Sequence, residues 1–189
     1  MQSNNLRGII LSSIFAAITA ILAQVQFDVS IVPFSGQTLA VGLTATIIGS
    51  RLGSLSMICY MLLGAIGLPV FSGFSGGPQI IAGPTGGFII GFIFTAFVTG
   101  WILEKTKFTI PVAIFANIIG MIITLTFGVV QLKYIADMSW NAAMATGVYP
   151  FIIVGIMKAV LASWIGIIVR RRLEKARLLS ITSEERKIA

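Results

Sequence analysis

Long apolar runs separated by short polar segments make up most of this chain. A helix that crosses the hydrocarbon core of a bilayer needs about 20 mostly apolar residues. By this criterion the pattern predicts six membrane-spanning helices, at residues 8–26, 34–49, 52–68, 86–103, 109–131 and 149–169. The second and third runs are short and only "GSRLG" separates them, so we expect them to be tilted or deeper in the protein than in the lipid. We therefore predict an all-α integral membrane protein that forms a single membrane domain over residues 1–189.

Composition supports the membrane class and excludes several kinds of chemistry. Of the 189 residues 57% are hydrophobic and 10% are charged, and the mean hydropathy is +1.00. Such a chain is far more apolar than an ordinary globular domain. It has no histidine and a single cysteine, which argues against zinc sites, Ser-His-Asp relays and disulfides. We expect no catalytic residues, no metal site and no cofactor.

The basic residues predict the orientation in the membrane. If the N-terminus is cytoplasmic, 11 of the 13 Lys and Arg residues fall on the cytoplasmic side. These residues are Arg7, Arg51, Lys105, Lys107 and all those from Arg170 onward. The positive-inside rule favours this arrangement and places both termini in the cytoplasm. The net charge of +7 then reports orientation rather than nucleic-acid binding, and residues 170–189 form a basic cytoplasmic tail with a short helical extension that contacts anionic lipid.

A glycine-rich outer connection, "PVFSGFSGGPQIIAGPTGG" (residues 69–87), carries almost no charge. Non-helical backbone is tolerated at membrane depth only where protein or a water-filled cavity satisfies its polar groups. The apolar residues Val70, Phe71, Ile80 and Ile81 are poorly suited to free solvent. We predict that this connection caps a small-molecule pocket; a flexible surface loop is the alternative.

Lys158 is the one charged residue in the apolar run from Pro150 to Val169. At 1.5 Å per residue it lies about 12 Å from Pro150 and about 18 Å from the basic end of the run. A lysine at this depth costs several kcal/mol without a partner, which favours a ligand-binding role. Snorkelling to the outer surface and a structural pairing with Asp137 or Asp28 are the alternatives.

Small residues recur at helical spacing in the first run: Ser13, Ala16, Ala17, Ala20 and Ala23. Small side chains three and four residues apart let another helix approach closely in a membrane. Sequence spacing alone does not decide between packing against the chain's own helices and a groove for a partner subunit.

Several motifs, taken together, resemble a known family. They are "PFSGQTLAV", "GSRLGSLS…YMLLGAIGLPVF", "GPTGGFIIGF" and the late "PF…MKA", which extend from about Pro33 to Arg170. The chain resembles the BioY family, the biotin-binding S components of energy-coupling-factor (ECF) transporters. The resemblance implies a six-helix protein of the bacterial cytoplasmic membrane that binds biotin near the outer surface. It also implies docking on a transmembrane T component that carries two ATP-binding-cassette ATPases.

The resemblance also assigns roles to individual residues. The Ala-x-x-x-Ala docking motif of the family falls on Ala16 and Ala20, and the late lysine of the family falls on Lys158, as a contact for biotin. Polar residues of the glycine-rich blocks become candidates for the biotin pocket: Gln37, Thr38, Gln79 and Thr85. Aromatic residues of the outer connections, Trp140, Tyr149 and Phe74, are candidates for its walls.

One position departs from the family. An acidic residue commonly precedes the late lysine by three positions, whereas this chain has Gly155 there. A carboxylate would accept hydrogen bonds from the ureido group of biotin or pair with the lysine. Without it, the affinity for biotin is lower or another acceptor substitutes, such as Gln79 or Asn141.

A second class of function remains open from the residues alone. A small secondary transporter or channel could act on another small molecule without an ATPase. Secondary transporters often show internal repeats and ionisable residues at the midplane, and this chain shows no evident repeat and no acid within its predicted spans. A binding subunit that takes its energy from ATPases fits the sequence better.

Overall fold

The computed structural model describes residues 2–27, 31–176 and 178–179, and it is mostly helical. Asp28 and the tail beyond residue 179 lie outside the described residues. In chain order the elements are α1 (Gln2–Ala23), β1 (Gln26–Phe27), β2 (Phe34–Ser35), α2 (Gln37–Ala65), the 3₁₀ turn η1 (Ser72–Phe74), α3 (Pro78–Ala82), α4 (Gly86–Lys105), α5 (Ile110–Ile135), α6 (Trp140–Gly147) and α7 (Tyr149–Lys175). The prediction of a helical protein is confirmed.

Five helical stretches of the described residues are long and apolar enough to cross a membrane. Four of them, α1, α4, α5 and the stretch that contains α7, overlap predicted spans, with boundaries that differ by up to nine residues. The fifth is α2, which contains both the second and the third predicted span. α7 continues to Lys175, which confirms a short helical extension after the last span.

The α2 run is two helical arms folded back on one another at Gly49. Gly49 has φ 82° and ψ −171°, a conformation that is open to glycine and strained for residues with a Cβ. A Cβ built on Gly53 would lie 3.5 Å from Ala45 Cα, whereas residues eight apart in a straight helix are separated by about 12 Å. The arms, residues 37–48 and 50–65, therefore correspond to the two short spans predicted on either side of "GSRLG".

α4 holds this bend in place. A Cβ on Gly100 would lie 2.3 Å from Ser50 N, so α4 packs directly on the backbone of the bend. Glu104 Oε1 accepts a hydrogen bond from Ser50 N (2.7 Å), and its Oε2 accepts one from Ser50 Oγ (2.6 Å). A carboxylate at this point satisfies an unpaired backbone N–H and complements the positive end of the second arm's dipole.

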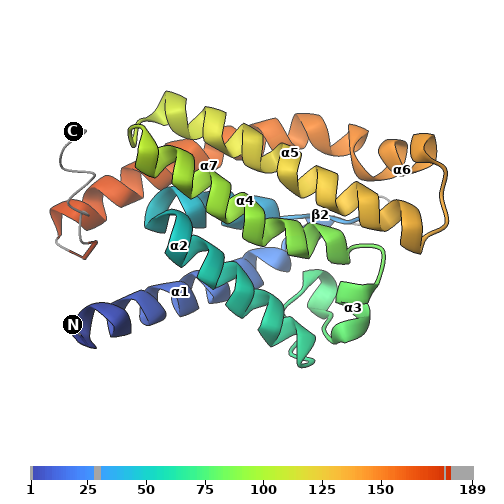
Figure 1. The fold of residues 1–189 in the computed structure, drawn as a ribbon, viewed down its shortest axis with the longest axis horizontal. Helices are drawn as coiled ribbons and strands as arrows, with labels where there is room; N and C mark the ends of the chain where they lie inside the picture. Colours follow the sequence, from blue (N-terminus) through green and yellow to red (C-terminus); the bar gives the residue numbers. More distant parts are fainter. Residues whose placement is uncertain (1, 28–30, 177, 180–189) are drawn as a thin grey trace.

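The helices form one bundle with two distinct ends (Figure 1). At the left of Figure 1, α1 begins, α2 bends, α4 turns into α5 and α7 ends. Exposed basic residues gather at this basic end: Arg7, Arg51, Lys105, Lys107, Arg171, Arg172 and Lys175. The β1–β2 hairpin, α3 and α6 lie toward the opposite end, which we call the loop end.

Large apolar side chains cover the outer faces of the helices. Ile153 on α7 is 73% exposed, Ile21 on α1 is 68% exposed and Phe115 on α5 is 62% exposed. Monomeric soluble proteins rarely expose contiguous apolar surface on this scale. Inside the bundle, the main core gathers Tyr60, Phe71 and Phe92 among residues of α1, α2, α4 and α5. The bundle is apolar on both its outer and its inner faces, as expected of a protein whose solvent is lipid.

Candidate ligand-binding site

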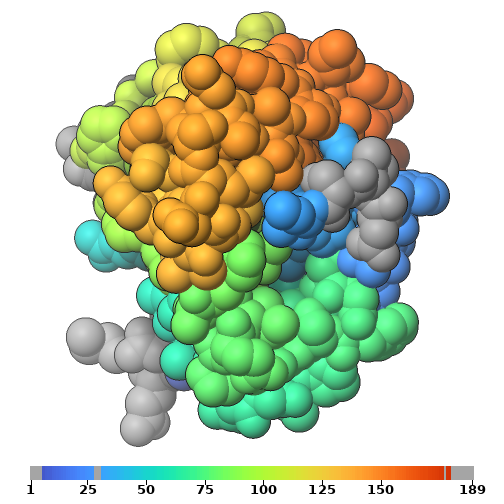
Figure 2. Space-filling model, turned by 90° about the vertical axis from the view of Figure 1, so that its right-hand side faces the viewer, coloured from blue at the N-terminus to red at the C-terminus, as the bar shows by residue number. Residues whose placement is uncertain are grey.

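A cavity of about 200 Å³ lies within the described bundle toward its loop end. Residues from β2, α2, the 66–85 connection, α4, α5 and α7 line it, so it is built from segments far apart in the sequence. Its walls are mainly apolar and include Phe71, Phe88, Phe92, Leu125, Phe151 and Val154. Figure 2 looks onto this end, where segments of α6 (orange), the 66–85 connection (green) and the hairpin (blue) meet.

The 66–85 connection, which contains most of the glycine-rich segment, forms part of this wall. Phe71, Ser72, Ser75 and Ile80 all line the cavity, and Phe71 is fully buried. A Cβ on Gly64 would lie 2.0 Å from Phe71 Cζ, so this glycine provides the space in which the ring sits. The connection is a packed element beside the cavity, in agreement with the cap that its apolar residues predict.

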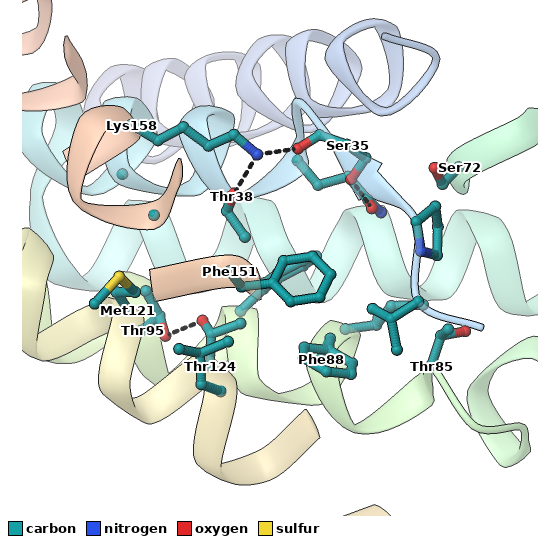
Figure 3. A pocket seen from close by; sticks show the side chains of 18 of the residues that line it. Ser35, Thr38, Ser72, Thr85, Phe88, Thr95, Met121, Thr124, Phe151 and Lys158 are labelled. Carbon is teal, nitrogen blue, oxygen red and sulfur yellow. Dashed lines mark hydrogen bonds between the residues drawn. The ribbon is translucent and has the colours of Figure 1, made fainter. Parts of the chain in front are cut away.

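Lys158 reaches into the cavity from α7 (Figure 3). Its Nζ donates hydrogen bonds to the backbone oxygen of Ser35 (2.7 Å) and to Thr38 Oγ1 (3.3 Å). Within the described residues no carboxylate lies within ion-pair distance of this ammonium, and Asp137 is exposed at the surface. The ammonium therefore points inward and is held by neutral acceptors alone.

Gln37 links three segments that surround the cavity. Ser35 Oγ donates to Gln37 Oε1 (2.6 Å), Gln37 Nε2 donates to Tyr60 Oη (2.7 Å), and Tyr60 Oη donates to the backbone oxygen of Val70 (3.0 Å). The chain of bonds connects the hairpin, both arms of α2 and the glycine-rich connection. Gln37 lines the cavity, and its amide also fixes the arrangement of the wall.

The structure brings together four of the seven residues predicted to bind the ligand. Lys158, Gln37, Thr38 and Thr85 all line the cavity. The other three lie outside its lining and are exposed: Gln79, Asn141 and Tyr149. Gln79 Nε2 donates to the backbone oxygen of Gly76 (2.7 Å) within its own loop. The candidate wall residues Trp140 and Phe74 are likewise exposed, at 49% and 71%.

Gly155 lies on the cavity wall beside Met121. A Cβ built on Gly155 would lie 2.4 Å from Met121 Sδ. The thioether therefore occupies the space into which an acidic side chain at position 155 would extend. In this chain the apolar side chain of Met121 lies where the resemblance leads one to expect a carboxylate.

The polar residues in the inner part of the cavity were not predicted from the sequence. Asn117 and Thr124 on α5 and Thr95 on α4 line it, and Thr95 and Thr124 lie across the cavity from Lys158 (Figure 3). Thr95 Oγ1 and Thr124 Oγ1 are 2.7 Å apart. The sequence does contain a signal for this region, the amide of Asn117 within the predicted span 109–131. Polar side chains inside membrane segments are costly and tend to be functional.

The predicted docking pair lies inside the fold rather than on its surface. Ala16 is 1% exposed and belongs to the main core, and Ala20 is half-buried and packs against that core. Among the residues of α1 from Leu6 onward, Ser13 and Ala17 are small and exposed. A docking role for Ala16 and Ala20 remains a prediction, and the contact that the structure shows for them is with the chain's own helices.

Fold and cavity together define a class of protein: a helical membrane protein with a mainly apolar cavity inside its bundle. The chain belongs to the BioY family, which it matches over residues 1–175. It is 38% identical over 174 residues to "Biotin transporter BioY2" of Lactococcus lactis subsp. cremoris (strain MG1363), with 92% of this chain and 95% of that protein covered. It is 37% identical over 163 residues to "Biotin transporter BioY" of Thermotoga maritima (strain ATCC 43589 / DSM 3109 / JCM 10099 / NBRC 100826 / MSB8), covering 86% of this chain and 95% of that protein.

The fold is also similar to that of a solved structure. The S-component for biotin from an ECF-type ABC transporter superposes with a TM-score of 0.80 at 23% identity, and the match covers 90% of this chain and 94% of that chain. This likeness shows that the two share a fold. The family and the named relatives are transport proteins, which confirms the expectation that the chain is not an enzyme.

Proposed function

We propose that this protein is the biotin-binding S component of an ECF transporter. The observation that supports this most directly is a cavity of about 200 Å³ with apolar walls and one inward-pointing lysine, in a chain of the BioY family. Small-molecule sites are typically apolar pockets with a few placed polar groups. Biotin offers an apolar bicycle, a ureido group and a valerate carboxylate, which suits such a site.

Lys158 binds the carboxylate of biotin in this proposal. Its ammonium is bonded to the Ser35 carbonyl and Thr38 Oγ1, both neutral, and no described acid pairs with it. Hydrogen bonds between oppositely charged groups are roughly twice as strong as those between neutral groups. A bound carboxylate would therefore replace a neutral partner by a charged one in a mainly apolar cavity. Gln37, Thr38 and Thr85 border the same cavity and serve as further polar contacts.

In the membrane, six helical segments span the bilayer, counting each arm of α2 as one, and both termini are cytoplasmic. The basic end of the bundle supports this orientation, because exposed Arg and Lys residues gather there and cytoplasmic segments favour basic residues. The loop end and the cavity then face outward, where biotin is captured. The whole chain forms one domain of the bacterial cytoplasmic membrane.

Transport requires a transmembrane T component and two ATP-binding-cassette ATPases. The glycine-rich "GPTGG" segment lacks the Gly-Lys-Ser/Thr of a P-loop. In this proposal the energy for release of biotin into the cytoplasm comes from the partner ATPases.

Uptake of labelled biotin tests this proposal. A biotin-auxotrophic bacterial strain without its own biotin uptake would receive this chain with the T component and ATPases of the same organism. The expected result is accumulation of labelled biotin that stops when either ATPase carries an inactivating substitution. Equal uptake by the chain alone would favour an autonomous secondary transporter instead.

A further inference from the structure

The inner part of the cavity contains one buried amide to which the proposed contacts assign no role. Asn117 lies on α5, about 10 Å along the helix from Ile110. Its side chain is 5% exposed, and it lines the cavity together with Gly42 and Ala162. This places it deeper in the bundle than Lys158, because Ala162 follows Lys158 by one turn of α7 toward the basic end.

The nitrogen of this amide is fully used within the protein. Asn117 Nδ2 contacts three acceptors: the backbone oxygen of Ala113 (2.9 Å), Ser163 Oγ (3.0 Å) and Thr46 Oγ1 (3.1 Å). A backbone carbonyl can only accept, so the nitrogen must be the atom that faces Ala113. An amide nitrogen carries two hydrogens, and three acceptors exhaust them. The orientation of the Asn117 side chain is therefore fixed.

The oxygen of the same amide has no donor among the described residues. Asn117 Oδ1 faces Gly42, where a Cβ would lie only 2.5 Å away. Because Gly42 has no side chain and both residues line the cavity, the oxygen can be reached from the cavity. No described side-chain oxygen is both fully buried and unpaired, so Oδ1 keeps accessible surface, and an acceptor without a protein donor at an apolar cavity is suited to a ligand N–H.

We propose that Asn117 Oδ1 accepts a hydrogen bond from a ureido N–H of biotin at the inner end of the cavity. The inference rests on the proposed function and adds the orientation of the ligand within the site. It also supplies the acceptor that Gly155 cannot provide. The two substitutes expected from the sequence, Gln79 and Asn141, are exposed and lie outside the cavity lining.

The two polar groups lie at different depths of the cavity. On α7, Lys158 Cα lies about 6 Å nearer the loop end than Ala162. The lysine side chain also bonds Ser35, in the hairpin at that end. A ligand with its ureido ring at Asn117 and its carboxylate at Lys158 extends along the cavity, with its apolar bicycle between apolar walls.

Biotin analogues test the inference on the unmodified protein first. The dissociation constant would be measured in detergent for biotin, for the two analogues that carry a methyl group on one ureido nitrogen, and for biotin amide. Loss of one buried hydrogen bond weakens binding about 10-fold to 100-fold, and at least one methylated analogue should show this loss. If both methylated analogues bind as tightly as biotin, the inference is overturned.

Asn117→Leu then identifies the acceptor. In this variant we expect the methylated analogue to bind within about threefold of biotin, while the penalty for biotin amide, which reports on Lys158, is retained. Thr99→Val is the matched control, because it removes a buried α4–α5 hydrogen bond to Ala116 O (3.2 Å) outside the cavity lining. If Asn117→Leu preserves the original discrimination, Asn117 is not the acceptor.

Gly42→Ala provides a second variant in case Asn117→Leu does not fold. The added Cβ would lie 2.5 Å from Oδ1 and 2.9 Å from Ala162 Cβ, so it should displace the amide oxygen and, in folded protein, reduce discrimination against the methylated analogue. Unchanged discrimination in folded Gly42→Ala would overturn the inference. Failure of the unmodified protein to bind biotin at all would reject the proposed function, and the inference with it.

Discussion

Lys158 is the residue that most directly connects the cavity to a ligand. Its ammonium is half-buried in an apolar surrounding, and neutral oxygens of Ser35 and Thr38 hold it in place. A buried charge without a charged partner is costly. A half-buried ammonium with apolar surroundings gains more from a carboxylate ligand than an exposed ammonium would, because solvent screens its charge less.

Replacing Lys158 by Met should weaken biotin binding about 10-fold to 150-fold, because a hydrogen bond to a charged group contributes about 1.5–3 kcal/mol. Calorimetric titration of the purified variant measures this loss. Lys133→Met is the matched control, because Lys133 lies over the ring of exposed Tyr134, outside the cavity lining. Unchanged affinity in Lys158→Met would show that Lys158 only holds the hairpin to α7.

Gly155 gives a second prediction at the residue scale. Gly155→Asp should lower the thermal stability of the detergent-solubilised protein, because its Cβ would collide with Met121 Sδ, 2.4 Å away. Overpacking of this kind typically costs about 1–3 kcal/mol. The double variant Gly155→Asp, Met121→Ala should recover most of the loss by making room for the carboxylate. Equal stability of the single and double variants would show that Met121 does not restrict this position.

Among the elements, the bend of α2 determines where the two arms lie. Gly49 supplies the positive φ, and Glu104 of α4 caps the second arm through Ser50. The first arm carries Thr38 and Gly42 of the cavity wall, and the second carries Tyr60, which bonds Gln37. The geometry of the cavity therefore depends on a bend at the opposite end of the bundle.

Glu104→Ala should destabilise the protein by about 1–2 kcal/mol, the usual cost of removing a helix cap. Glu104→Gln should lose less, because its amide oxygen can still accept from Ser50 N. Thermal melting in detergent compares the two variants, with the exposed neighbour Lys105→Ala as a control. Equal stability of all three variants would show that the cap contributes nothing to the bend.

Helix α1 gives a prediction about assembly with the T component. Ala16 is buried and Ala17 is exposed, so a leucine at each position should have a different effect. Ala16→Leu should lower stability by about 1–3 kcal/mol through overpacking. Ala17→Leu should keep both stability and biotin binding.

If the T component docks on the outer face of α1, Ala17→Leu should also reduce co-purification with that subunit. The opposite result is also informative. If Ala17→Leu co-purifies normally and a folded Ala16→Leu variant does not, the docking contact lies at Ala16 and Ala20.

At the scale of the whole molecule, the helical bundle was predictable because a bilayer sets the length of an apolar span. That constraint located α1, α4, α5 and α7 and the two arms of α2. It does not apply to short elements outside the apolar core, so α3, α6 and the β1–β2 hairpin were not predicted. Ser139 was an available signal for α6, since its hydroxyl accepts from Ala142 N as an N-cap.

The site was predictable only in part, for a different physical reason. The helices are apolar on every face, so hydropathy does not indicate which side of a helix turns inward. Lys158 could be predicted as a ligand-binding residue because it is charged. Asn117 became a candidate for ligand binding once the fold placed it opposite Gly42. Gln79 and Asn141 were candidates by residue type, and the fold leaves both exposed.

Biotin binding by this protein is tested most directly by titration of the purified, detergent-solubilised protein, with desthiobiotin and thiamine as comparison ligands. We predict saturable binding of one biotin per chain in the nanomolar range, weaker binding of Lys158→Met and no binding of thiamine. Absence of biotin binding by a folded protein, or binding that is indifferent to Lys158, would contradict this prediction.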